Sequence, residues 1–198
     1  MQQAYKLSFV AGGLLLPETA AIASRYLEQP DWEAIRREVE TGQLLRTTRS
    51  SSRLRYFQEI RRRFRVASSF EPAFLAGEIQ VSRLANFAIC CRYYQFLGDF
   101  IVDVVRDKLR VGDRTLGSVD FYSFFEQKIK ERPELERISD STRVKVKTVL
   151  FRMLSEAGIF DPATRTITAP QIPERLLYAY RQAGDSDALV HLLVSEGN

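Results

Sequence analysis

The chain has 198 residues, a length that suits one large domain or two small ones. Hydrophobic residues make up 45% and aromatic residues 11% of it, which excludes a disordered chain and predicts a sizeable core. The most apolar region, residues 84–105, contains Arg92, Asp99 and Asp103, so it does not read as a membrane span. Residues 1–16 have no basic segment ahead of their apolar residues, so no secretory signal is expected.

Short elements open the chain. Residues 5–9 alternate in polarity and are interpreted as a short strand or an extended arm. Pro17 predicts the start of a helix that continues over residues 18–29. A second helix is expected over residues 32–41, with Asp31 as its N-cap.

The next stretch, residues 46–65, concentrates the positive charge. It holds eight arginines and one acid, Glu59, which leaves a local net charge of +7, whereas the whole chain carries +4. Hydroxyl residues precede it, and such residues favour helix starts because their oxygens accept hydrogen bonds from free backbone N–H groups. We therefore expect a helix whose beginning is rich in Thr and Ser.

Helical spacing divides this stretch into two faces. The predicted buried stripe comprises Leu54, Phe57, Ile60 and Phe64. A different face collects Arg55, Gln58, Arg62 and Arg65, with Arg61 at its margin. Guanidinium groups beside a hydroxyl-rich helix start suit phosphate, although a solvated face whose arginines pair with acids elsewhere is the alternative.

A long apolar region follows over residues 79–109 and is expected to run through the middle of the fold, with a break near residues 95–98. Cys90 and Cys91 are adjacent, so a disulfide between them is disfavoured, and both are interpreted as core residues in a reducing cytoplasm. Residues 110–117 form a loop and a candidate hinge.

The last third predicts helices around a small hairpin. A helix is expected over residues 142–157, with a buried face and an opposite face of Lys145, Thr148, Arg152 and Ser155. A hairpin follows over residues 159–168, and further helices close the chain. Helix, hairpin and helix is the order of a winged helix-turn-helix, in which Lys145, Thr148 and Arg152 would enter a major groove and Arg165 would lie on the wing.

The fold class is therefore mainly all-α, with a small β-hairpin near the C-terminus and two helical subdomains, residues 1–110 and 111–198. No Ser/His/Asp arrangement, paired carboxylates, zinc ligand set or nucleotide-binding loop is recognisable. His191 lies in an apolar C-terminal segment and is interpreted as a packed or surface imidazole. We expect no enzyme, no cofactor and no metal.

Four stretches together resemble one family. They are YKLSFVAGGLLLPET (5–19), LLRTTRSSSRLRYFQEIRRRF (44–64), AICCRYYQFLGDFIVDVVRDKL (88–109) and ISDSTRVKVKTVLFRMLSEAGIF (138–160). The combination resembles the BrxA family of bacteriophage exclusion (BREX) phage-defence systems. The resemblance implies a largely helical, cytoplasmic, non-enzymatic protein associated with double-stranded DNA, and the family is also compared with NusB-type antitermination factors, which bind RNA. It supplies no catalytic residues.

The expected function is binding of nucleic acid, most of all double-stranded DNA, within a BREX defence assembly that contains other BREX components. RNA binding in the NusB manner and a scaffold role for an acidic protein partner are the alternatives. The candidate nucleic-acid contacts are Arg46, Arg49, Ser50, Ser51, Ser52, Arg53, Arg55, Arg62, Arg65, Lys145, Thr148, Arg152 and Arg165.

Overall fold

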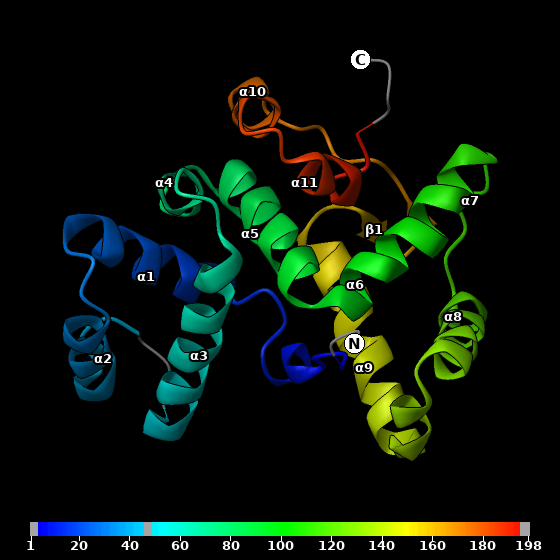
Figure 1. Cartoon of the computed structure of the whole chain (residues 1–198), viewed down its shortest axis with the longest axis horizontal. Helices are drawn as coiled ribbons and strands as arrows, with labels where there is room; N and C mark the ends of the chain where they lie inside the picture. The colour runs from blue at the N-terminus through cyan, green and yellow to red at the C-terminus, as the bar shows by residue number, and fades with distance from the viewer. Residues whose placement is uncertain (1–3, 46–48, 195–198) are drawn as a thin grey trace.

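A computed structural model describes residues 4–45 and 49–194 of the chain, and these residues are mainly helical. The helices are α1 (Leu16–Glu28), α2 (Trp32–Thr41), α3 (Ser50–Arg63), α4 (Glu71–Leu75), α5 (Ile79–Tyr93), α6 (Gln95–Phe100), α7 (Asp107–Arg110), α8 (Ser118–Glu131), α9 (Asp140–Glu156), α10 (Glu174–Gln182) and α11 (Ser186–His191). A hairpin of β1 (Phe160–Asp161) and β2 (Thr166–Ile167) follows α9. In Figure 1, α1 to α3 lie at one end of the long axis, α8 and α9 lie toward the other, and α5 and α6 run between them.

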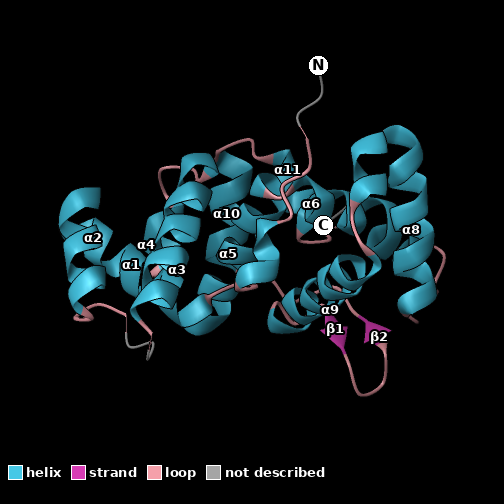
Figure 2. Ribbon diagram, turned by 90° about the horizontal axis from the view of Figure 1, so that it is seen from below, coloured by secondary structure: helices cyan, strands magenta, loops and turns pink. Residues whose placement is uncertain are grey.

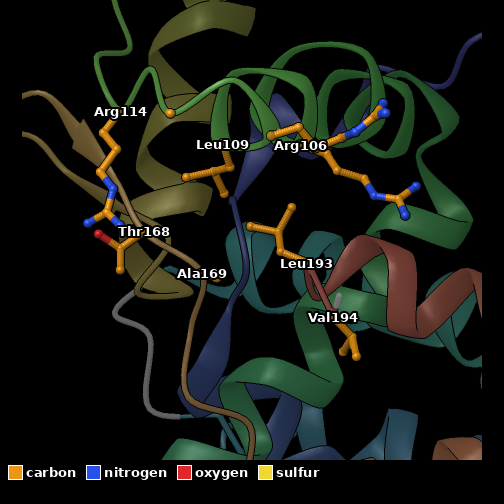
Figure 3. A pocket seen from close by; sticks show the side chains of 9 residues that line it. Arg106, Leu109, Arg114, Thr168, Ala169, Leu193 and Val194 are labelled. Carbon is orange, nitrogen blue, oxygen red and sulfur yellow. The ribbon is translucent and has the colours of Figure 1, made fainter. Parts of the chain in front are cut away.

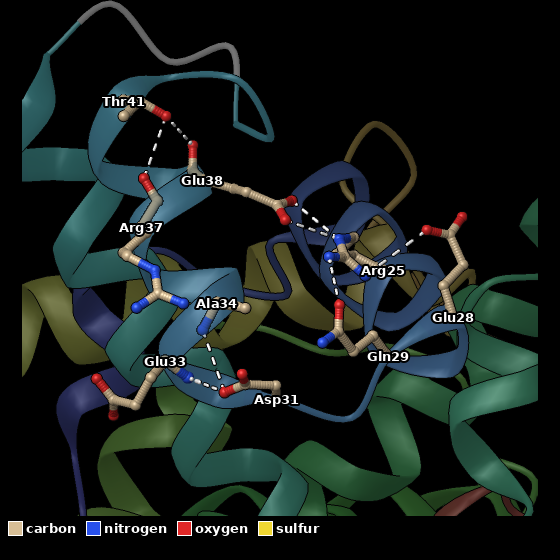
Figure 4. A network of polar contacts seen from close by, with 9 residues as sticks. All are labelled: Arg25, Glu28, Gln29, Asp31, Glu33, Ala34, Arg37, Glu38 and Thr41. Carbon is tan, nitrogen blue, oxygen red and sulfur yellow. Dashed lines mark hydrogen bonds and ion pairs between the residues drawn. The ribbon is translucent and has the colours of Figure 1, made fainter.

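Helices α1, α2 and α3 pack around their own small hydrophobic cluster, which includes Ile22, Ile35, Val39 and Phe57. The bounds of α2 match the prediction, and the Asp31 carboxylate caps it by accepting from the backbone N–H groups of residues 33 and 34. Arg25 on α1 donates two hydrogen bonds, of 2.8 and 3.0 Å, to the Glu38 carboxylate on α2 (Figure 4). Burial and this ion pair together fix α2 beside α1.

The predicted apolar region forms several consecutive helical segments. Helix α5 ends at Tyr93, and α6 begins at Gln95, so the predicted break lies one residue ahead of its expected position. A π-helical stretch, Ile101–Arg106, joins α6 to α7. Most of α5 is buried on all sides, and the larger hydrophobic cluster forms around α5 and α6. The centre of the molecule is therefore the apolar region that the sequence marks.

The larger hydrophobic cluster contains side chains from Phe9 to Leu193 and therefore draws on both sides of residue 110. The division into subdomains 1–110 and 111–198 stays a prediction. The loop proposed as a hinge is bonded to the hairpin, since Leu116 N–H donates to Arg165 O at 2.9 Å and Ile167 N–H donates to Arg114 O at 2.8 Å. Thr115 also forms an isolated antiparallel bridge with Thr166.

The N-terminal segment forms neither a strand nor a simple extended arm. Residues 4–7 are irregular, and a 3₁₀ turn follows at Ser8–Ala11. Tyr5 donates a hydrogen bond to Asp99, which lies in α6, and Ser8 Oγ donates to Glu59 Oε1 in α3 at 2.7 Å. The segment thus bonds to both the α3 end and the central helices, a long-range role that alternation in sequence does not reveal.

Cys90 and Cys91 are free and fully buried, as expected of core residues. Burial raises the pKa of the Cys90 thiol to about 11 and also raises the pKa of Cys91, so both stay protonated near neutral pH. Across the described residues, the helices are too short or too polar to cross a membrane.

Candidate nucleic-acid interface

The exposed face of α3 is arranged as its helical spacing predicts. Phe57 and Ile60 are buried, and Leu54 and Phe64 are half-buried, so the predicted stripe faces the core. Arg55, Gln58, Arg62 and Arg65 are exposed, and Arg61 is half-buried at the margin. Arg65 lies in the 3₁₀ turn Phe64–Val66 that directly continues α3. Its guanidinium and those of Arg55 and Arg62 face solvent, and the three together are called the arginine face of α3.

Arg63 departs from this pattern, because it is only 1% exposed. Its guanidinium donates to Gly13 O at 2.6 Å, to Leu14 O at 2.7 Å and, through Nε, to Tyr94 Oη at 2.9 Å. Tyr94 in turn donates to Glu59, the one acid of the basic stretch, which is also buried. Burial raises the pKa of Tyr94 well above its ordinary value, so the hydroxyl remains a donor. Arg63 holds the fold together and is not available to a ligand.

Two further arginines of α3 contact α2. Arg53 donates from Nε to Val39 O at 3.1 Å and from Nη2 to Glu40 O at 3.2 Å, which are carbonyls in the last turn of α2. Arg61 lies 3.4 Å from the Glu33 carboxylate, and its guanidinium carbon is 5.8 Å from the centre of the Trp32 ring. The positive charge of the stretch is thus divided between residues that hold α2 and residues that face solvent.

The start of α3 differs in detail from the expectation. Arg49 is the N-cap residue, and its side chain makes no capping hydrogen bond. Ser50, Ser51 and Ser52 occupy the first turn inside the helix and do not precede it, with the first two exposed and the third half-buried. Arg49 is exposed, while Arg46, Thr47 and Thr48 lie outside the described residues. An exposed arginine and two exposed hydroxyl residues therefore stand at the N-terminal end of α3.

The second predicted element, α9, also has the expected two sides. Val146, Val149, Leu150, Met153 and Leu154 are buried. Lys145, Thr148 and Arg152 are exposed, and they recur at spacings of three and four residues on the outer side. Glu156 Oε1 lies 3.5 Å from Arg152 Nε, so one of these cations has an acid beside it. The N-cap is Ser139, which accepts from Thr142 N–H at 3.3 Å.

A groove of about 680 Å³ lies between α9, the hairpin and the start of α8. It brings together three predicted residues from two parts of the chain, Thr148 and Arg152 of α9 and Arg165 of the hairpin. Lys147, Ser118 and Ser155 also line it, and Lys147 Nζ donates to Ser118 Oγ at 3.0 Å. Its apolar walls are Leu116, Val119, Phe151, Phe160 and Pro162. Among the described lining residues none is acidic, so the groove is positive and suited to an anion.

Sequence reasoning missed Lys147 and Ser118. Lys147 lies beside the buried positions of α9 on the helical wheel, which makes it look like a flanking residue. Only the packing of α8 against α9 reveals that its ammonium group reaches the groove and lies 5.1 Å from the centre of the Tyr122 ring. Ser118 at the start of a helix has the pattern of a capping residue, but the N-cap is Gly117, whose N–H donates to Asp120 Oδ2 at 2.7 Å.

The hairpin that carries Arg165 has an ordered turn. Asp161 accepts from Ala163 N–H and from Thr164 Oγ1, each at 2.9 Å, and these bonds, the backbone one foremost, lower the pKa of its carboxyl group. Arg165 adopts a left-handed backbone with φ of 57°, and its side chain is exposed. In Figure 2 the hairpin projects from the same side of the molecule as the first turn of α3, at a different place along the long axis.

A further cavity, of about 760 Å³, lies behind the hairpin and is lined by Arg106, Leu109, Arg110, Gly112, Arg114, Thr168, Ala169, Leu193 and Val194. Figure 3 places Arg114 beside Thr168, with the aliphatic side chains of Leu109 and Leu193 between them and Arg106. The arginines border the cavity on different sides and do not converge on one point. We assign it no part in the candidate interface.

The remaining buried charges form a structural network. Arg92 binds both Glu71 and Asp185, and Tyr180 Oη donates to Glu71 Oε1 at 2.7 Å. Burial, opposed by Arg92, raises the pKa of Glu71. Burial also lowers the pKa of His191 from its ordinary value, so this imidazole is neutral near pH 7. The part of the chain that the structure describes contains no cluster of three or more His, Cys, Asp or Glu side chains able to hold a metal ion.

Comparison with known proteins now identifies the family. The sequence profile of BrxA matches residues 3–183. The chain belongs to the BrxA family. A BREX protein BrxA from Paramagnetospirillum magneticum is 26% identical over 193 residues, which cover 96% of this chain and 97% of that protein. A BREX protein BrxA from Escherichia coli is 23% identical over 182 residues, which cover 91% of this chain and 85% of that protein.

A solved structure has a similar fold. The crystal structure of an uncharacterized protein from Magnetospirillum magneticum superposes with a TM-score of 0.84 at 26% sequence identity, and the match covers 98% of this chain and 100% of the other. The fold of this chain is therefore shared with that protein over nearly the full length of both chains.

Proposed function

We propose that this BrxA-family protein is a non-enzymatic component of a BREX phage-defence system that binds double-stranded DNA in the cytoplasm. Its BREX relatives imply partners among other BREX components. The observation that carries the DNA proposal is the exposed arginine face of α3, with Arg55, Arg62 and Arg65 on one side. Arginine forks match phosphate oxygens, and each neutralised phosphate releases counterions, which makes such a face a strong contact for a polyanion.

The alternative of a neutralised charged face is weakened by the contacts of these residues. Arg62 lies 3.5 Å from Glu59 Oε2, but this carboxylate also accepts from Ser8 and Tyr94 inside the protein. Half of the Arg62 side-chain surface stays exposed. Arg62 therefore keeps donors directed to solvent, in contrast to the fully engaged Arg63.

The region from α8 to β2 adds a second contact. Bridge residue Thr115, α8, α9, β1 and β2 follow one another in the chain, and β2 pairs with both β1 and Thr115. This is the order of a winged helix-turn-helix, with α9 as the recognition helix and the hairpin as the wing. The connection between α8 and α9 runs over residues 132–139, longer than the three or four residues of a simple helix-turn-helix.

This second contact favours DNA over RNA. The major groove of B-form DNA admits a helix, whereas that of A-form RNA is deep and too narrow for side chains to read. Lys145, Thr148 and Arg152 on the outer side of α9 would reach base edges or flanking phosphates. NusB-like RNA binding would use the same arginines of α3 without this helix.

The test is a mobility shift with a DNA duplex and a variant that carries Arg55→Glu, Arg62→Glu and Arg65→Glu. We expect the affinity to fall by about 100-fold or more, because phosphate contacts become repulsions. The circular dichroism spectrum should be unchanged, since all three side chains are exposed. Arg53 and Arg63 are left intact because they hold the fold.

A matched control reverses the same number of exposed charges elsewhere, at Lys130, Arg137 and Arg175. This control should retain duplex binding. An equal loss in both variants, or undiminished binding by the α3 variant, would contradict the proposed interface. An RNA duplex of the same sequence should compete poorly, and a denaturing gel should show the DNA strands uncut and unaltered.

A further inference from the structure

An aromatic cavity lies at the C-terminal end of the arginine face. It has a volume of about 490 Å³ and is lined by Tyr26, Trp32, Arg61, Phe64, Arg65, Ala67, Ser68, Ser69 and Pro72. Tyr26, Trp32 and Phe64 are in mutual contact, with ring centres 4.9 to 5.5 Å apart, yet each is only half-buried. Ring surface thus remains open to a ligand.

The polar groups of the cavity favour an anion. Arg61 and Arg65 line it, together with the hydroxyl residues Ser68 and Ser69. The described lining residues include no acid. Glu33 pairs with Arg61 at 3.4 Å, and the buried Glu71 carboxylate accepts from Ser68 N–H at 2.6 Å, which leaves Arg65 as the cation of the cavity that pairs with no carboxylate among the described residues. Aromatic rings for stacking beside guanidinium groups for phosphate are what proteins use to bind unpaired nucleotides.

The position of the cavity connects it to the duplex contact. Arg65 belongs both to the exposed face of α3 and to the cavity lining. The volume falls in the range of small-ligand sites and suits a single nucleotide. A base inside a duplex has both faces covered by its stacked neighbours, so only an unpaired base can stack on these rings. A strand that follows the α3 face and then leaves the duplex would bring its first unpaired base to this cavity.

We propose that the cavity formed by Tyr26, Trp32 and Phe64 binds an unpaired nucleotide of DNA at a junction between duplex and single strand. The base stacks against the aromatic rings, and Arg65 contacts the adjacent phosphate. This inference rests on the proposed duplex binding by α3, which delivers the strand, but it adds a preference that duplex binding by itself does not produce.

The protein contains its own probe, since Trp32 is the one tryptophan among 198 residues. Three DNAs are compared: a blunt duplex, the same duplex with a short single-stranded overhang, and that duplex with an abasic overhang of equal length. The abasic overhang keeps the phosphates and lacks the bases. We expect the base-bearing overhang to bind about ten-fold more tightly than the abasic one and to quench Trp32 fluorescence.

A charge placed in the cavity tests the location. Ser69→Glu puts a carboxylate among the lining residues, and Ser186→Glu puts the same charge on an exposed serine at the start of α11. Ser69→Glu should remove the preference for the base-bearing overhang and leave blunt-duplex affinity within about two-fold, because its serine is not on the α3 face. Ser186→Glu should keep the preference and the quenching.

The outcomes separate the two proposals. In one outcome, the protein binds the blunt duplex, binds both overhangs with equal affinity and shows unchanged Trp32 fluorescence. That result would overturn the cavity assignment and leave the proposed duplex binding intact. A preference that persists in Ser69→Glu would overturn it as well. Failure of the wild-type protein to bind any of the three DNAs would instead contradict the proposed function.

Discussion

Arg62 and Arg63 are neighbours in the sequence and have opposite surroundings. The side chain of Arg62 is half exposed on the outer side of α3. The side chain of Arg63 is buried and bonds to two backbone carbonyls and the Tyr94 hydroxyl. A step of one residue on a helix turns the side chain by about 100°, which is enough to move it from solvent to the interior. At the scale of single residues, the charge of an arginine therefore says little about its role until its direction is known.

This pair yields a prediction about stability and binding. Arg63→Met should lower the free energy of unfolding by about 3 kcal/mol, because Gly13 O, Leu14 O and the Tyr94–Glu59 pair lose a buried charged donor. Arg62→Met should change it by no more than about 0.5 kcal/mol, since its side chain is exposed. Urea denaturation followed by circular dichroism measures both.

For DNA affinity the order of the two variants should reverse, with the larger effect at Arg62. Arg62→Met should weaken duplex binding, and Arg63→Met should leave it unchanged at temperatures where the protein remains folded. Equal stability of the two variants would show that the buried contacts of Arg63 do not matter to the fold.

The link between α2 and α3 belongs to the scale of the elements. Gly42 ends α2 with a left-handed backbone at φ of 79°, and its N–H bonds to carbonyls of the last turn. Arg53 of α3 donates to the Val39 carbonyl as well and also to the Glu40 carbonyl of that turn, where the partial negative charge of the helix end favours a cation. The predicted DNA contact Arg53 thus acts as a helix clamp and orients α3 relative to α2.

We therefore expect Arg53→Met to lower the free energy of unfolding by about 1.5 kcal/mol, the usual loss for hydrogen bonds from a charged donor. The matched variant is Arg55→Met, two residues along the same helix on its exposed side, and it should be nearly neutral for stability. Thermal unfolding of both variants checks the difference. If the hydrogen bonds of Arg53 do not stabilise the protein, both variants will have the melting temperature of the wild type.

At the scale of the whole molecule, the question is whether the two basic elements contact the same DNA duplex. The α3 face and the groove beside α9 lie at different places along the long axis, on a side that Figure 2 shows in common for the start of α3 and the hairpin. The large core around α5 and α6 holds the intervening helices together. A single duplex that contacts both elements would lose phosphate contacts independently when either is altered.

Salt dependence measures this directly. Changing Arg55, Arg62 and Arg65 to Ala should reduce the slope of log affinity against log salt by about 3, and changing Lys145, Arg152 and Arg165 to Ala should do the same. The combined variant should show the sum of the two reductions. Fluorescence anisotropy with a long duplex provides the slopes. No effect of the second set, in the presence of an effect of the first, would restrict DNA to α3.

The sequence by itself determined the helical class, the bounds of α2, the buried and exposed sides of α3 and α9, and the hairpin within residues 159–168. These follow from periodicity, capping residues and turn residues, which act within a few positions of the chain. Only the tertiary structure decided that Arg53 and Arg63 face inward to carbonyls, that Lys147 joins Thr148, Arg152 and Arg165 in a groove, and that Trp32 and Arg65 line one cavity. Those contacts join residues far apart in the chain, and local pattern carries no information about which distant groups a side chain will meet.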